Sequence, residues 1–159
     1  SPENPRDRRS EPREPSPTSF ELATGHFLVG APTLRLGPEL TRADFCASSL
    51  FAAATDFVVA EPERSWKLAQ LVLCGQSFTT ILRFRGEHLQ RVDLMHDDPR
   101  YGSSWDDWTP ALELERKAQH EAWLGQLFGA QREFAWGSVA QVQDAHYGTF
   151  AIVLRYRRA

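Results

Sequence analysis

The sequence has few of the residues that indicate a disulfide framework or a redox role. Of its 159 residues only two are cysteines, Cys46 and Cys74, and no C-x-x-C pair occurs. This excludes a thioredoxin-like motif and a zinc site built from thiolates. Both cysteines have apolar neighbours, where a thiol usually packs as a small hydrophobic side chain. We therefore expect both to be structural.

Long apolar segments are also missing. No run approaches the ~18 residues that a membrane span needs, and the start of the chain has no hydrophobic segment typical of a signal peptide. The formal net charge of −3 gives no basic field of the kind that nucleic-acid-binding proteins usually show. We expect a cytoplasmic protein that binds neither membranes nor nucleic acids.

The familiar catalytic and cofactor signatures do not occur. The sequence has no G-x-G-x-x-G, P-loop, H-E-x-x-H or G-x-S-x-G motif. Because an enzyme can also assemble its residues from distant positions, an enzymatic role stays open. The leading hypothesis is a non-catalytic protein-binding domain without a cofactor.

The composition predicts a tail followed by one domain. Residues 1–19 hold five prolines, four arginines and four acids but no large apolar side chain. Such a segment cannot bury enough surface to offset the entropy of ordering, so we expect a disordered tail. The whole chain is 42% apolar, which is enough for one core, and we expect a single domain over residues 20–159.

The hydrophobic patterns predict an α+β fold. Alternation over 78–84 and the return through 90–94 indicate an antiparallel hairpin. Thr41 and Thr109 are candidate N-caps of two helices, the second running to Gly129. We predict a mostly antiparallel sheet of about six strands packed by two helices. The second helix has one narrow stripe of mainly small residues, Ala111, Leu114, Ala118 and Ala122, and a neighbouring apolar stripe of Leu112, Trp123 and Leu127. The small residues of the first stripe are expected to allow a close approach to the sheet.

The segment 97–108 is the strongest candidate for a partner-binding surface. It combines large aromatic side chains, which dominate binding hot spots, with a negative field that would attract a basic partner. Its candidate residues are Asp97, Asp98, Tyr101, Trp105, Asp106, Asp107 and Trp108. The alternative is that the tryptophans complete the core while the acids stay solvated.

Two further readings concern ligands. Glu113 and His120 on the second helix could face a pocket between that helix and the sheet, as in a small enzyme or ligand-binding domain. A metal site could draw on His96, Asp97, Asp98 and His120, with Asp106 and Asp107 adding oxygens for calcium. These acids occur as adjacent pairs rather than at the alternate positions of a calcium loop. We predict no metal. Apart from ligands, Arg83, Arg85 and Arg155 could form a strip of arginines across neighbouring strands, which would complement the acidic loop of another copy.

A further set of motifs extends over most of residues 27–156. It comprises the S-W-D-D-W run at 104–108, E-L-E-R-K at 113–117, His120, Trp123-Leu124, Phe134, Trp136-Gly137 and Val139, and also Phe45, Ser48, Phe51, Trp66, Leu68, Gly75, Phe78, Leu82, Phe84 and Leu89. In these motifs the chain resembles a family of small uncharacterised bacterial proteins, and it is similar in style to the immunity proteins that accompany bacterial toxins. The resemblance implies a partner rather than a reaction, the partner being a cognate toxin blocked by direct contact.

Overall fold

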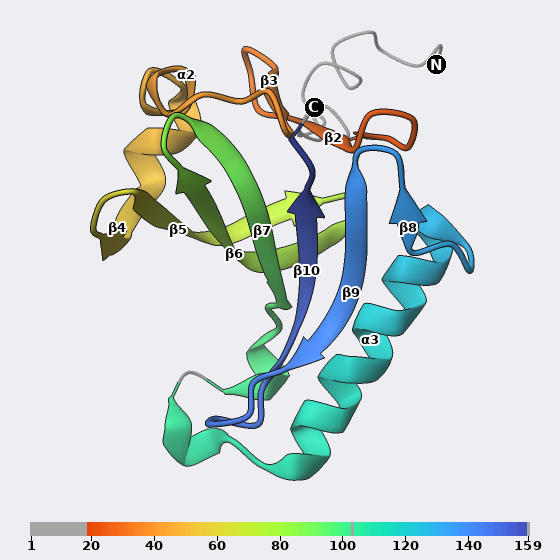
Figure 1. Ribbon diagram of the computed structural model, residues 1–159. Helices are drawn as coiled ribbons and strands as arrows, with labels where there is room; N and C mark the ends of the chain where they lie inside the picture. The colour runs from red at the N-terminus through yellow and green to blue at the C-terminus, as the bar shows by residue number, and fades with distance from the viewer. Residues whose placement is uncertain (1–18, 103, 159) are drawn as a thin grey trace, which may run out of the picture.

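The computed structural model describes residues 19–102 and 104–158 (Figure 1). The tail expected over 1–19 lies outside these residues except for Ser19, which begins a strand and pairs with Leu28. The described residues contain a three-stranded sheet, a seven-stranded sheet and two α-helices, so the α+β prediction is confirmed. The strands outnumber the six expected because several short edge strands have no sequence pattern of their own.

Both sheets are antiparallel throughout. The smaller sheet has the order β1-β2-β3 and the larger one β4-β5-β6-β7-β10-β9-β8. The strands are β1 (Ser19–Glu21), β2 (His26–Val29), β3 (Leu34–Leu36), β4 (Ala54–Val59), β5 (Glu63–Leu73), β6 (Gln76–Arg85), β7 (His88–His96), β8 (Glu133–Phe134), β9 (Gly137–Gln143) and β10 (Phe150–Tyr156). The helical segments are α2 (Arg42–Cys46), α3 (Pro110–Phe128), η1 (Ser49–Ala53), η2 (Pro99–Tyr101) and η3 (Trp105–Asp107).

The long helix α3 begins and ends where its sequence predicts. Thr109 Oγ1 accepts a hydrogen bond of 3.1 Å from the Leu112 N–H, and Pro110 occupies the first turn, where its missing N–H costs nothing. The helix stops at Gly129, whose φ of 61° is easily reached only by glycine. Figure 1 shows α3 lying along one face of the larger sheet, beside β9 and β10.

The stripe of small residues on α3 does not face the sheet as predicted, whereas Trp123 of the neighbouring apolar stripe is buried. Ala111, Leu114, Ala118 and Ala122 are all exposed, and the buried side chains are Glu113, His120, Trp123, Leu124 and Phe128. Polar contacts explain this orientation. The Trp123 indole donates to the Leu73 carbonyl at 3.1 Å, and the His96 N–H donates to His120 Nε2 at 2.9 Å. The partners that orient the helix lie on β5 and β7. The hydrophobic periodicity of the helix sequence therefore does not reveal which face is buried.

The two sheets and both helices contribute to one hydrophobic cluster. It includes Phe27 from β2, Phe45 from α2, Phe84 from β6 and Trp123 from α3, all at most 2% exposed. Stacked and edge-on aromatic pairs run through it, and such pairs add to the free energy gained from burial alone. The smaller sheet is therefore part of the same packed body as the larger one.

Trp136, in the turn between β8 and β9, and Tyr156 of β10 also hold the smaller sheet by hydrogen bonds. The Trp136 indole N–H donates to the Leu22 carbonyl at 2.8 Å, and the Tyr156 hydroxyl donates to the Gly25 carbonyl at 2.9 Å. The Trp136 ring lies so close to Gly25 that a Cβ there would be 2.4 Å from it. Glycine at position 25 is thus required by packing as well as by its φ of 75°.

The start of β9 brings two backbones unusually close. A Cβ on Gly137 would lie 1.9 Å from the Arg155 carbonyl oxygen, and Gly137 has a φ of 153°. We expect Gly137→Ala to lower the free energy of unfolding by about 2–3 kcal/mol, measured by urea unfolding. Gly75→Ala is the control, because its φ is also positive but nothing lies within 4 Å of the added Cβ. It should cost about 1 kcal/mol. Equal losses in the two variants would contradict the close approach.

Candidate functional site

The loop between β7 and α3 and the turn between β9 and β10 meet at one end of the molecule (Figure 1). We call the surface that they form the acidic aromatic surface. It comprises Asp97, Asp98, Trp105, Asp106, Asp107, Trp108 and Tyr147. Six of these residues were predicted from the sequence, and Tyr147 is added by the fold.

Two aromatic rings of this surface are stacked and open to solvent. Trp105 is 59% exposed and Tyr147 is 54% exposed, and their ring centroids are 5.2 Å apart with planes at 28°. Trp108 is half-buried, with its ring centroid 6.4 Å from that of Trp105. Because Tyr147 lies in a short turn without a periodic pattern, its sequence context gives no signal that it would join Trp105.

Hydrogen bonds hold the turn that carries Tyr147. One oxygen of Asp144 accepts from the N–H groups of His146 and Tyr147, at 2.8 and 2.7 Å. These two bonds favour the ionised carboxylate and lower the pKa of Asp144. Tyr147 is therefore presented by a defined turn.

Tyr101 does not belong to the surface, contrary to our expectation. It is only 7% exposed, and its hydroxyl lies 3.0 Å from His96 Nδ1. The Arg116 guanidinium lies over its ring, 4.5 Å from the centroid. Tyr101 instead anchors η2, and so the loop that continues to Trp105, against the sheet.

The four aspartates of the surface are exposed to different degrees. Asp97 and Asp98 are half-buried, and Asp98 Oδ1 caps η2 by accepting from the Arg100 N–H at 2.9 Å. Asp106 and Asp107 are exposed in η3. These four carboxylates are accompanied in the loop by a single cation, Arg100. The loop thus carries more acidic than basic side chains beside its exposed aromatic rings.

Glu113 and His120 do not form an open pocket but belong to a buried polar network. Glu113 is 3% exposed, and its two oxygens accept from the Arg116 guanidinium and from the Phe150 N–H, the latter at 2.9 Å. Arg116 Nε also donates to the His96 carbonyl at 3.2 Å. The network joins α3 to β7 and β10, so Glu113 is occupied in holding the helix on the sheet.

His120 is fully buried and bonded at both ring nitrogens. Nε2 accepts from the His96 N–H, so the proton of the neutral ring is on Nδ1, which donates to Gln141 Oε1 at 2.8 Å. Burial, reinforced by the nearby charge of Arg116 and by His96, lowers the pKa of His120 to about 4, although the bond to Gln141 opposes this. The ring is neutral at pH 7 and serves as a structural link between α3 and the sheet.

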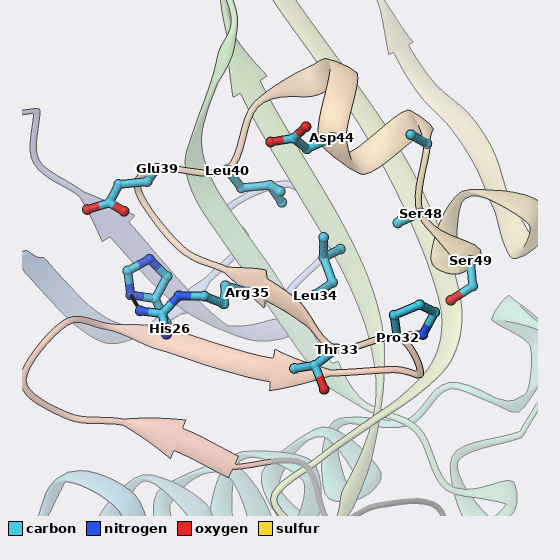
Figure 2. Close-up of a pocket in the computed structure, with 11 residues that line it drawn as sticks. His26, Pro32, Thr33, Leu34, Arg35, Glu39, Leu40, Asp44, Ser48 and Ser49 are labelled. Atoms are coloured by element: carbon cyan, nitrogen blue, oxygen red, sulfur yellow. Dashed lines mark hydrogen bonds between the residues drawn. The ribbon is translucent and has the colours of Figure 1, made fainter.

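A pocket of about 500 Å³ lies between β3 and α2 (Figure 2). Leu34 and Leu40 lie at its centre, and polar groups, among them Glu39 and Asp44, are placed around its rim. His26 is buried there and contacts Arg35 at 3.4 Å through Nδ1. Burial and then the charge of Arg35 lower the pKa of His26. The sequence pattern gave no indication of this pocket, because its lining comes from separate segments.

Within residues 19–102 and 104–158, no three His, Cys, Asp or Glu side chains lie close enough to bind a metal ion together. None of the helices described here combines the length and the apolar character needed to cross a bilayer.

Comparison of the chain with protein-family models, curated proteins and solved structures found no match.

Proposed function

We propose that this chain is a non-catalytic protein-binding domain, and that the acidic aromatic surface binds a basic patch on its partner. The observation that carries the proposal is the stacked pair of Trp105 and Tyr147, both more than half exposed. Trp105 shares η3 with Asp106 and Asp107. Large aromatic side chains contribute much of the binding energy at protein interfaces. Surrounding charge of one sign speeds the encounter with a partner of the opposite sign.

The buried network supports the same proposal. It fixes α3 and, through Tyr101, the start of the loop that carries Trp105. An interface whose side chains are held in place before binding loses less conformational entropy when the complex forms. The similarity in style to immunity proteins suggests the kind of partner. We propose a cognate bacterial toxin, neutralised by direct contact in the cytoplasm.

The test is co-expression with the product of the neighbouring open reading frame, followed by a binding titration of the purified pair. We expect the double variant Trp105→Ala, Tyr147→Ala to bind at least about tenfold more weakly and to lose protection. Phe57→Ala is the control, because Phe57 is similarly exposed but lies on β4. Unchanged binding by the double variant would remove the acidic aromatic surface from the interface.

A further inference from the structure

The face of the larger sheet opposite α3 carries a row of arginines. Side chains alternate between the two faces of a strand, and Gln141 of β9 faces α3 through its bond to His120. On β10, Ile152 is paired with Gln141, so Arg155 lies on the opposite face. Arg155 is paired with Arg91 on β7, and Arg91 with Arg83 on β6. Three guanidinium groups therefore project from adjacent strands in one register.

A single buried carboxylate holds two of these arginines. Asp93 accepts from Arg83 Nε at 2.8 Å through Oδ2, and it accepts from Arg91 Nε and Nη2. Because Asp93 bonds the Nε side of Arg83, both terminal Nη groups of that guanidinium remain as donors. Within residues 19–102 and 104–158, no carboxylate forms an ion pair with Arg155. Asp93 therefore orients Arg83 and Arg91, but its single negative charge does not neutralise the three guanidinium groups.

The row opens onto a pocket of about 470 Å³. Arg83, Arg91 and Arg155 line it together with Ser65, which is paired with Arg83 on β5. Its volume lies in the range of small-molecule sites, about 300–1,000 Å³. Arg85 also lines the pocket, but it is paired with Glu63 at 3.2 Å. The pocket is therefore large enough for a small molecule and is lined by several hydrogen-bond donors.

We propose that this pocket binds a small molecule through a phosphate monoester group. The choice of phosphate follows from charge. Three guanidinium groups and the Asp93 carboxylate leave a net charge of +2, since Arg85 and Glu63 cancel. A phosphate monoester carries about −1.5 to −2 at pH 7, whereas a carboxylate carries about −1. Arginine forks also match the oxygens of phosphate in geometry.

The proposed phosphate site is separate from the acidic aromatic surface. Arg91 is near the start of β7 and His96 at its end, which places them about 17 Å apart along the strand. The loop with Trp105 follows beyond His96. The double variant Trp105→Ala, Tyr147→Ala should therefore bind phosphate as the wild type does, so the two proposals can fail independently.

The experiment is titration of the full chain with inorganic phosphate, followed by amide chemical shifts and by calorimetry. We expect saturable shifts at residues 83, 91 and 155. Arg83→Gln and Arg155→Gln should each weaken binding by about tenfold or more. Arg83→Gln leaves Asp93 bonded to Arg91, and Arg155→Gln removes an exposed side chain, so both variants should fold. Arg100→Gln is the control, because it removes the same charge at the other end of β7.

Two outcomes would overturn the proposal: no saturation with phosphate, or wild-type affinity in Arg155→Gln. A second series compares glucose 6-phosphate, acetate and a phosphoserine peptide. We expect glucose 6-phosphate to bind more tightly than inorganic phosphate, and acetate to bind about tenfold more weakly. Acetate binding as well as phosphate would contradict the choice of phosphate. Tighter binding of the peptide than of the sugar phosphate would contradict a small-molecule ligand.

Discussion

Replacing Glu113 with alanine is expected to lower the free energy of unfolding by about 3–5 kcal/mol. The variant would leave the Arg116 guanidinium and the Phe150 N–H without their acceptor in the protein interior. An unpaired buried charge costs much more than the net gain from the ion pair itself. Urea unfolding followed by tryptophan fluorescence measures the difference. Part of the loss should be avoided in Glu113→Gln, which keeps a hydrogen-bond acceptor at the same place.

The matched control is Glu115→Ala, two positions along the same helix. Glu115 is exposed, so its removal deletes the same charge from α3 without opening the buried network. We expect a change within about 0.5 kcal/mol. If Glu113→Ala were as mild as Glu115→Ala, the network would not be what holds α3 to the sheet, and helix packing would have to rest on the apolar side chains alone.

The second large effect is a loss of stability in mild acid. The folded protein holds the pKa of His120 at about 4, against an ordinary value of 6.5, because burial disfavours the charged ring. Between these two pH values the unfolded chain binds a proton that the folded protein does not. Above pH 6.5 the free energy of unfolding is not affected by protonation of His120. As the pH decreases from 6.5 toward 4, protonation of this residue in the unfolded chain lowers the free energy of unfolding by about 3 kcal/mol in total. His26 and His96 also have lowered pKa values and act in the same direction.

Unfolding titrations at pH 7 and pH 5 test this expectation. His120→Gln keeps an acceptor for the His96 N–H but does not titrate, so stability should depend less on pH in the variant than in the wild type. The ring signals of His120, followed by NMR, give its pKa directly. A ring that titrates near 6.5 in the folded protein would show that His120 is not the source of the acid sensitivity.

Local patterns were sufficient to predict the α+β class, the long helix and the central hairpin. Thr109 specifies a helix start because its side chain accepts a hydrogen bond from a free backbone N–H, and Pro110 because it has no N–H to satisfy. Both effects depend only on residues that are close in sequence. The alternation over 78–84 likewise reflects one strand with one buried face. The order of strands could not be predicted, because β10 pairs with β7 and β9 through contacts far apart in the chain.

Among the candidate site residues, too, features that depend on local sequence were predicted and features that depend on distant contacts were not. Trp105 is exposed as the acidic loop suggested, but Tyr101 is buried, because its hydroxyl and ring meet His96 and Arg116 from other elements. The exposure of the small-residue stripe of α3 was not predicted, because the polar contacts that orient the helix come from other elements. Arg83 and Arg155 were recognisable on alternating strands, whereas the place of Arg91 beside them depends on an irregular register between β6 and β7.

The central position of β10 has a consequence for synthesis of the protein on the ribosome. β10 fills the space between β7 and β9, yet it is translated after both of them. Until residues 150–156 leave the exit tunnel, β7 and β9 each keep an unpaired edge, and such edges readily pair with other chains. A nascent chain arrested before residue 150 should therefore be prone to aggregation, whereas release of those seven residues closes both edges at once.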